Sequence, residues 1–415
     1  MKINSSTTSQ GCPFHASQEY KPFDLTNPFP FYRKAREEAP VFYSEELGYY
    51  VITRYEDIKA VFSNWKTFTS ENAQSPFKPI APKAKALMEA QGMIGLSGLS
   101  GRIPPDHTRI RRIVSMAFGL SRFKKLEPRI RALAVETIEK FRNEGHAELI
   151  RQLAYDLPAY VIFMLLGVPD DEVQQVKSWA ESRLLMTWGD LTEDEQLIHA
   201  QNMVNYWNYC QNIVSLRHQT PSDDLPGDLV ALQKEGHEIT DREIAAICYS
   251  MLFAGHETTT SLIGNGIREL LTYPESWKAI CRDKSLIPNA IEEILRFSPS
   301  IVSWRRKSLE EAEIGGVKIP AGANILLVMG SGNRDEANFE NGETFDIERE
   351  NAKEHLSFGY GIHFCLGSPL AKLEAKIVLE ELTERLPNLT LKPGQTFAFA
   401  PNTSFRAPVA LEVEF

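Results

Sequence analysis

The chain has 415 residues, and 43% of them are hydrophobic, which is enough for a sizeable core in one large domain or in several smaller ones. Acidic residues outnumber basic ones by 55 to 45, and the net charge of -10 disfavours a nucleic-acid partner, because such a protein needs a basic face. The five cysteines form no C-x-x-C pair, so neither a zinc cluster nor a disulfide framework is indicated.

The N-terminal region shows no sign of export or anchoring. Residues 1–20 are polar, so we expect them to be disordered, and we expect residues 21–415 to form a single domain because no linker interrupts them. The densest apolar run, at 160–168, has about half the ~20 residues that a membrane span requires. The expected location is therefore the reducing cytoplasm, without a membrane partner.

Two early segments carry clear local signals. Residues 41–58 alternate apolar and polar side chains around a Leu-Gly pair, which predicts a hairpin followed by a short helix. Between residues 105 and 295 the pattern is helical. Within it, residues 126–145 place Pro128 in the first turn of an expected helix and a glycine beyond its end.

A long helix is predicted at 240–273. Thr240 and Glu243 have the spacing of a capping box, and Pro274 follows the expected end. At 1.5 Å per residue this helix would be about 50 Å long, enough to cross the molecule.

The stretch AGHETTT at 254–260 is unusual inside that helix, because a mid-helix glycine and three threonines lower helix stability. One interpretation is a kink with threonine hydroxyls bonded to carbonyls one turn earlier. The other is that a loosened turn presents Glu257 and Thr258 to a pocket. The residues alone favour the first interpretation.

The pattern changes after residue 310. Residues 313–328 predict a hairpin around a Gly-Gly pair, and residues 397–415 predict further strands. The expected fold class is thus mainly α, a helical bulk with small β-sheets at its edges.

The loop FGYGIHFCLG at 358–367 places a cysteine in unusual surroundings. A free cysteine is more often a small buried hydrophobe, which is what we expect of the other four. Here the glycines allow sharp turns, and a helix predicted from residue 368 puts the Cys365 thiol at its N-terminus, where the dipole favours a thiolate. Such a thiolate suits an axial haem ligand, and it also suits a nucleophile with His363 as its base. Spacing alone leaves both chemistries open.

The pattern F-G-x-G-x-H-x-C-x-G is matched by Phe358, Gly359, Gly361, His363, Cys365 and Gly367. This loop resembles the haem-ligand loop of the cytochrome P450 family. The resemblance implies the P450 fold and haem b, with Cys365 as the axial ligand of the iron and Phe358, Gly359, Gly367 and Ala254 in contact with the haem.

The resemblance also implies roles in the long helix. Glu257 and Thr258 match the acid–alcohol pair of the family, which steadies dioxygen and relays protons to it. Ala254 and Gly255 would matter by being small, because oxygen and substrate approach over that turn.

The haem propionates need cations or hydrogen-bond donors. By motif position, the expected anchors are His107, Arg111, Arg306 and His363, with Arg305 as the alternative to Arg306.

The pair Glu293 and Arg296 matches the E-x-x-R motif that the family carries on the helix after the long one. The two residues stand three apart on one helical face, and Glu292 would serve the spacing equally well. The resemblance implies that this ion pair is structural.

Apolar segments with aromatic residues indicate a small hydrophobic or aromatic substrate. The expected pocket residues are Met93, Ile94, Leu96, Leu252, Phe253, Ile301, Val302 and Phe405.

The implied activity is that of a haem-thiolate monooxygenase, which inserts one oxygen atom from O2 into the substrate by hydroxylation, O-dealkylation or epoxidation. Electrons from NAD(P)H would arrive through a ferredoxin and reductase or through a fused reductase, because the sequence has no flavin or nicotinamide motif. A basic run, Arg109, Arg111, Arg112, Arg122, Lys124 and Lys125, is expected to steer an acidic electron donor. The alternatives are a peroxide-driven peroxygenase and a non-enzymatic haem sensor or carrier.

Overall fold

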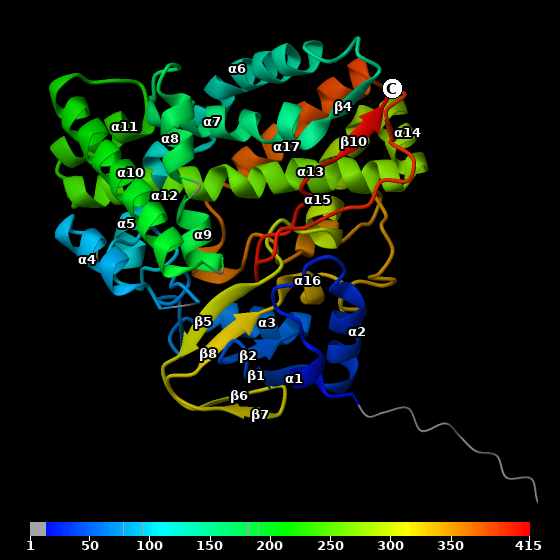
Figure 1. The fold of residues 1–415 in the computed structure, drawn as a ribbon, viewed down its shortest axis with the longest axis horizontal. Coiled ribbons are helices and arrows are strands. Elements are labelled where there is room, and N and C mark those ends of the chain that lie inside the picture. The colour runs from blue at the N-terminus through cyan, green and yellow to red at the C-terminus, as the bar shows by residue number, and fades with distance from the viewer. Residues whose placement is uncertain (1–13, 78, 94, 181, 190) are drawn as a thin grey trace, which may run out of the picture.

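The computed structural model describes residues 14–415 except 78, 94, 181 and 190, and it divides into a helical part and a β-rich part (Figure 1). The helices are α1 (Ala16–Glu19), α2 (Phe29–Glu38), α3 (Tyr55–Ser63), α4 (Pro82–Ala90), α5 (Asp106–Ala117), α6 (Leu120–Glu139), α7 (Asp156–Leu166), α8 (Val173–Ala180), α9 (Ser182–Trp188), α10 (Glu193–Gln219), α11 (Leu225–Lys234), α12 (Asp241–Gly255), α13 (Glu257–Thr272), α14 (Pro274–Arg282), α15 (Ile287–Phe297), α16 (Met329–Gly332) and α17 (Ser368–Arg385). The strands are β1 (Val41–Ser44), β2 (Tyr49–Ile52), β3 (Phe68–Thr69), β4 (His146–Glu148), β5 (Trp304–Ser308), β6 (Ala312–Ile314), β7 (Val317–Ile319), β8 (Asn324–Leu327), β9 (Thr390–Leu391) and β10 (Glu412–Glu414). The mainly helical fold with small sheets is as predicted.

The largest sheet has the order β1-β2-β8-β5-β3, and only its β2–β8 pair is parallel. Both predicted hairpins are confirmed: β1 pairs with β2, and β6 pairs with β7. Gly48, Gly315 and Gly316 adopt positive φ in the two turns, a conformation that glycine tolerates best. Because successive strand residues face opposite sides, the sheet is covered by a separate apolar cluster on each face.

The helix expected at 126–145 starts earlier than predicted. It is α6, which begins at Leu120 after the extended Gly119, so Pro128 lies well inside it rather than in its first turn. A proline inside a helix leaves the carbonyl four residues earlier without its N–H partner, here that of Lys124. Lys124 is exposed, so water can satisfy this carbonyl.

The N-terminal boundary also differs from the prediction. Within the segment expected to be disordered, residues 16–19 form α1, and Ala16 and Tyr20 are buried in the cluster that α2 joins. Residues 1–13, which include Cys12, lie outside the described residues.

The predicted long helix consists of two helices that run end to end through the helical part, α12 and α13 (Figure 1). The capping box is present: Glu243 N donates to Thr240 Oγ1 at 3.2 Å, and Thr240 N donates to Glu243 Oε2 at 2.8 Å. The end before Pro274 is also as predicted, and the two helices meet at His256.

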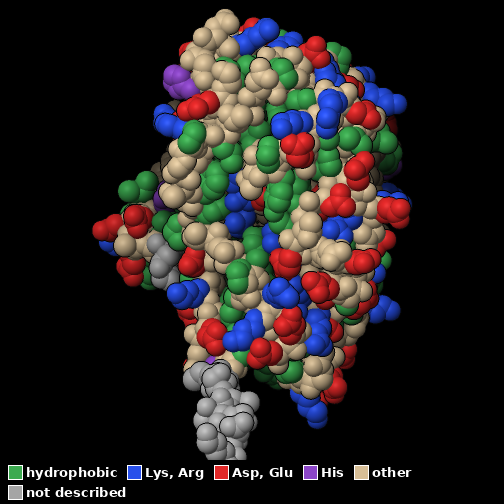
Figure 2. All heavy atoms as spheres, turned by 90° about the vertical axis from the view of Figure 1, so that its right-hand side faces the viewer, with side chains coloured by type: hydrophobic (Ala, Val, Ile, Leu, Met, Phe, Trp, Pro, Cys, Tyr) green, Lys and Arg blue, Asp and Glu red, His purple; other side chains and the backbone are tan. Residues whose placement is uncertain are grey.

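No helix among the described residues is long and apolar enough to cross a membrane. Figure 2 shows one face of the molecule, on which acidic and basic side chains are interspersed.

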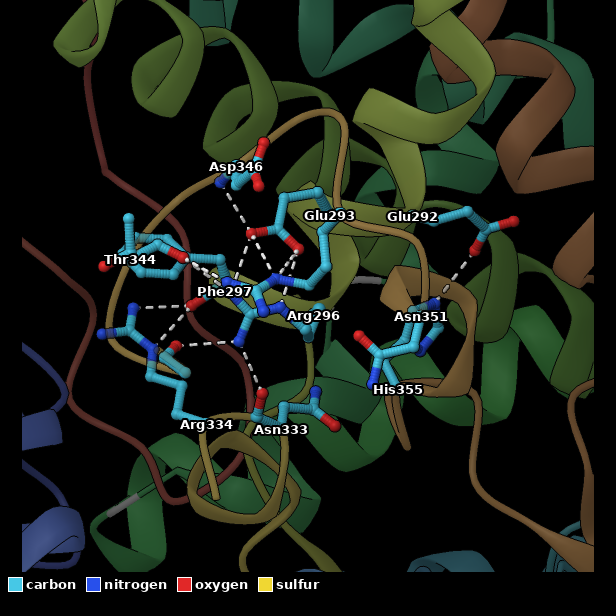
Figure 3. Close-up of polar contacts among 12 residues, drawn as sticks. Glu292, Glu293, Arg296, Phe297, Asn333, Arg334, Thr344, Asp346, Asn351 and His355 are labelled. Carbon is cyan, nitrogen blue, oxygen red and sulfur yellow. Dashed lines mark hydrogen bonds and ion pairs between the residues drawn. The ribbon is translucent and has the colours of Figure 1, made fainter. Parts of the chain in front are cut away.

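The ion pair of α15 is completely buried. Arg296 binds both carboxylate oxygens of Glu293 at 2.7 Å, and both side chains are 0% exposed (Figure 3). Arg296 also donates to the carbonyls of Asn333, Gly342 and Thr344. The guanidinium therefore fastens the chain between α16 and the cysteine loop to α15.

The carboxylate of Glu293 is equally engaged. It accepts the backbone N–H of Asp346 at 2.8 Å and lies 3.3 Å from Arg349 Nε. Glu292, the other acid that the spacing allowed, points away from Arg296 and binds His355 and Lys372 (Figure 3).

Replacing Glu293 by Gln should lower the free energy of unfolding by about 3–5 kcal/mol, because two buried arginines lose their counter-charge. Urea denaturation measures the change. The matched control is Glu292→Gln on the next residue. The Glu292 carboxylate and its partner Lys372 are partly exposed, although its other partner His355 is buried, so this loss should cost less, about 1 kcal/mol. Equal effects of the two substitutions would contradict a special role for Glu293.

Candidate active site

A cavity of about 270 Å³ lies between the break in the long helix and the loop that carries Cys365. Ala254 and Thr258 face it from α12 and α13, and Cys365 faces it from the loop. Ala254 and Cys365 are accessible from the cavity although they lie inside the molecule. A thiol thus borders a large, mainly apolar interior space.

The loop holds this thiol by backbone bonds. Gly359 and Gly361 have φ of +71° and +70°, and Cys365 N donates to the carbonyl of Phe358 at 2.9 Å. The backbone N–H groups of Gly367 and Ser368, where α17 begins, point at the sulfur. Burial raises the pKa of the Cys365 thiol, and these two N–H groups oppose the rise. A positive centre placed against the sulfur would favour the thiolate further.

The loop is connected to the ion pair of α15. Asn333, whose carbonyl Arg296 binds, accepts Leu356 N at 2.7 Å and donates to Ser357 Oγ at 2.8 Å. Ser357 Oγ in turn donates to the carbonyl of Leu295 on α15. The residues just before Phe358 are therefore fixed by buried hydrogen bonds.

The cavity wall fits a haem with two propionates, because hydrogen-bond donors gather on one side of it and the donor of one of them, His107, is unpaired. Both ring nitrogens of His107 are buried without a hydrogen-bond partner among the described residues, and its ring lies 4.2 Å from that of His363. Arg111, Arg306 and His363 line the cavity beside them. Four donors with few acceptors suit two carboxylates.

Two of these four residues form one hydrogen bond each with other parts of the protein. His363 Nε2 lies 3.1 Å from Ser70 Oγ, and Arg111 Nη2 donates to the carbonyl of Phe364 at 2.7 Å. Burial, helped by nearby arginines, lowers the pKa of His107 to about 4 and that of His363 to about 3. Both histidines are therefore neutral near pH 7.

The structure separates the two consecutive arginines of β5. Arg306 lines the cavity, and burial lowers its pKa to about 10. Arg305 points to the other face of the strand, where it donates to the carbonyl of Ser75 and lies 4.2 Å from the ring of Phe77. Of the two, Arg306 is the one on the side of Arg111 and His363.

At the helix break, both interpretations of AGHETTT hold for Thr258. Thr258 Oγ1 donates to the carbonyl of Ala254 at 2.6 Å, as the kink interpretation requires, and Thr258 also lines the cavity. Glu257 does not line the cavity with it. Successive residues of a helix point about 100° apart, so Glu257 faces away from the direction of Thr258. Its Oε1 lies 3.6 Å from the ring Nδ1 of His256.

Gly255 lines the cavity together with Ala254. Its small size also serves packing, because a Cβ at this position would lie 2.3 Å from Ile162 Cδ1, and the glycine thus admits this side chain of α7.

The predicted pocket residues fall into three groups. Phe253, Ile301 and Phe405 line the cavity, as do Phe358, Gly359 and Gly367 of the loop. Four others do not line the cavity: Met93, Leu96, Leu252 and Val302. In the case of Leu252 and Val302, the neighbouring Phe253 and Ile301 face it instead. Ile94 lies outside the described residues.

Several wall residues were not predicted. Ile247, Ser250 and Met251 precede Ala254 on α12, and helical spacing from Ala254 and Thr258 would have identified Ser250. Trp304, which ends the apolar segment that begins at Ile301, lines the cavity as expected of that segment, whereas Gln74 also lines it without any local signal in the sequence.

The basic run is smaller than expected from the sequence. Arg109 pairs with Asp106 and Glu243, and Arg122 pairs with Asp228. The exposed members are Arg112, Lys124 and Lys125, of which Lys125 lies 3.4 Å from Asp223.

Comparison with known proteins gives a consistent picture. The sequence model of the family described as Cytochrome P450 matches residues 26–397. The 6-deoxyerythronolide B hydroxylase of Saccharopolyspora erythraea is 34% identical over 364 residues, which cover 87% of this chain and 89% of the relative. The solved structure of cytochrome P450 CREJ in complex with (4-ethylphenyl) dihydrogen phosphate has a TM-score of 0.93 and 51% identity, covering 97% of this chain and 100% of that one. An intact type IV self-sufficient cytochrome P450 monooxygenase has a TM-score of 0.92 and 35% identity, covering 99% of this chain and 55% of that one.

His256 should make stability depend on pH. Its Nε2 donates to the carbonyl of Tyr155 at 2.8 Å, and burial lowers its pKa from the usual 6.5 to about 4. As the pH falls, His256 therefore takes up a proton in the unfolded chain at a higher pH than in the folded protein. Up to about 3 kcal/mol of stability should be lost between pH 6.5 and pH 4.

Denaturation of the wild type and of His256→Asn across this range measures the effect. The variant should be less stable at pH 7 but should lose less stability on acidification. The exposed His146→Asn serves as the control and should keep the wild-type slope. An unchanged slope in His256→Asn would exclude His256 as the source.

Proposed function

This chain belongs to the cytochrome P450 family and is a haem-thiolate monooxygenase, and on that premise we propose that its substrate is an aromatic compound of the alkylphenyl type. The observation that carries the proposal is an aromatic cluster at the cavity, made of Trp188, Phe253 and Phe405. Trp188 and Phe253 stack at 5.0 Å, and Phe405 packs edge-on against both. The complex of the 51% identical CREJ with a 4-ethylphenyl ligand supports the same substrate class.

When bound, the haem supplies the activation of O2 and the insertion of one of its atoms into the substrate. We assign Cys365 as the axial ligand, because it presents a sulfur to the cavity from a loop fixed by backbone bonds. The propionates would be held by Arg111 and Arg306, with His107 and His363 as neutral donors.

Thr258 and Glu257 would manage protons in this scheme. The Thr258 hydroxyl donates a hydrogen bond to the Ala254 carbonyl, so its oxygen is free to accept one from a group in the cavity. Rotation of the hydroxyl would let it donate to that group instead. Glu257 lies outside the wall beside the neutral His256, so it would supply protons to Thr258 from behind rather than touch the substrate.

Electrons would come from NAD(P)H through a redox partner. This partner is either a separate ferredoxin with its reductase or a fused reductase, and the similarity to a self-sufficient monooxygenase supports the fused form. The relatives described above are a hydroxylase and monooxygenases, and they give no support to a peroxygenase or a haem sensor.

Replacing Cys365 by His should abolish the red-shifted absorption band that the ferrous carbon monoxide complex of a thiolate-ligated haem shows, because the sulfur is lost. Absorption spectroscopy of the reduced protein under carbon monoxide checks this. Cys281→Ser, a half-buried cysteine of α14 away from the cavity, should keep the band. A normal band in Cys365→His would disprove the assigned ligand.

Replacing Thr258 by Ala should slow product formation by about 100-fold or more, because a positioned proton donor is lost. Consumption of reduced nicotinamide should continue and end in hydrogen peroxide. Product, peroxide and nicotinamide are measured together in the reconstituted system. Thr260→Ala removes a buried hydroxyl that does not line the cavity, and it should leave the ratio of product to peroxide unchanged. Normal coupling in Thr258→Ala would remove Thr258 from the proton relay.

A further inference from the structure

A buried arginine without a carboxylate partner lies behind one end of the cavity. Arg183 of α9 is 8% exposed, and its guanidinium donates to three neutral acceptors: Tyr249 O at 3.3 Å, Ser250 Oγ at 3.5 Å and Gln74 Oε1. No ion pair joins it to any carboxylate in the part of the chain that the structure describes. Because a buried cation is costly unless it is paired, this site favours an anion.

Gln74 connects this cation to the cavity. Its side chain lines the cavity wall, and its Oε1 is held by Arg183. A side-chain amide has an acceptor oxygen and a donor NH2 group. Because Arg183 binds the oxygen of Gln74, the NH2 group of this amide remains free to donate. The Nε2 group, which has no hydrogen-bond partner among the described residues, is the end available to a ligand.

The arginine is close to the aromatic cluster. The guanidinium carbon of Arg183 lies 5.4 Å from the ring centre of Phe253, which stacks on Trp188. A second buried cation, Arg305, lies 5.2 Å from the ring centre of Trp188, and its Nε and Nη2 have no acceptor among the described residues. Two uncompensated positive charges thus flank the rings that would hold an aromatic substrate.

No ion pair joins either arginine to a described carboxylate of the cavity wall. Among the described wall residues the only carboxylate is Glu374, which is carried by α17 after the Cys365 loop. Arg111 and Arg306 also line the cavity, but they belong to the side where His363 lies, which the propionates would occupy. Arg183 is therefore the arginine available to bind a negative charge on the substrate.

We propose that this end of the cavity recognises the phosphate group of an aryl phosphate ester, with Arg183 as the cation and the Gln74 amide as a second donor. The inference rests on the aromatic substrate class proposed above. On binding, a phosphate oxygen replaces the neutral Gln74 oxygen on Arg183, and Gln74 turns its Nε2 to another phosphate oxygen. A charged acceptor makes the stronger bond, which is the source of selectivity for the ester over the free phenol.

Calorimetric titration of the haem-loaded protein tests this without relying on turnover. The ligands are 4-ethylphenyl phosphate, 4-ethylphenyl sulfate and 4-ethylphenol. The wild type should bind the phosphate roughly 10- to 100-fold more tightly than the phenol, because bonds to a charged group are gained. The sulfate, with one charge, should fall between them.

Gln74→Glu is the sharpest variant, because it gives Arg183 an internal counter-ion of the same size and should preserve folding. It should abolish the preference for phosphate while changing phenol affinity less than about threefold, since the rings of the cluster are untouched. Arg183→Gln should have the same selective effect. Lys85→Gln, an exposed residue of α4, changes the net charge as Arg183→Gln does and should leave all three affinities unchanged.

Three outcomes would overturn the proposal: equal binding of phosphate and phenol by the wild type, equal binding of sulfate and phosphate, or an undiminished preference in Gln74→Glu. Each would leave the monooxygenase function intact if the phenol or another aromatic compound is still hydroxylated. Failure of the aromatic substrate class itself would instead show as no binding of any of the three ligands.

Discussion

The position of the Cys365 thiol depends on the buried ion pair between Glu293 and Arg296. Arg296 fixes the carbonyl of Asn333, and the side chain of Asn333 fixes the two residues that precede the cysteine loop. Each group in this network is buried, so each lost bond would leave an unpaired polar atom in the core. The loop that carries this sulfur is thus held by residues of α15 that lie about 60 to 70 positions earlier in the sequence.

The second constraint is the space itself. A large cavity inside a helical core removes packing contacts, and here it is bordered by a helix that breaks at His256 and by small residues at Ala254 and Gly255. The break lets Thr258 bond back to a carbonyl and still face the cavity. The protein therefore accepts a weakened helix at the turn that borders the cavity.

Local signals carried most of the successful predictions. The Gly-Gly hairpin, the capping box at Thr240 and the helix after Cys365 depend on residues close in sequence, and all three are present. Pro128 was misjudged, because α6 already begins at Leu120 and accommodates the proline on an exposed face, where water can satisfy the carbonyl that loses its N–H partner. The separation of Arg305 from Arg306 and the contact of Arg183 with Gln74 arise from packing between distant segments, which spacing in one sequence does not reveal. The family pattern selected residues that the structure brings together around Cys365, and it selected few of those at the other end of the cavity, which carry no motif.

The central claim is that the sulfur of Cys365 binds the iron of a haem in this cavity. X-ray absorption at the iron edge of the haem-loaded wild-type protein tests it most directly, because scattering from sulfur differs from that of nitrogen and oxygen. The account predicts one sulfur in the first shell of the iron, in addition to the nitrogens of the macrocycle. A first shell of nitrogen and oxygen alone would contradict it.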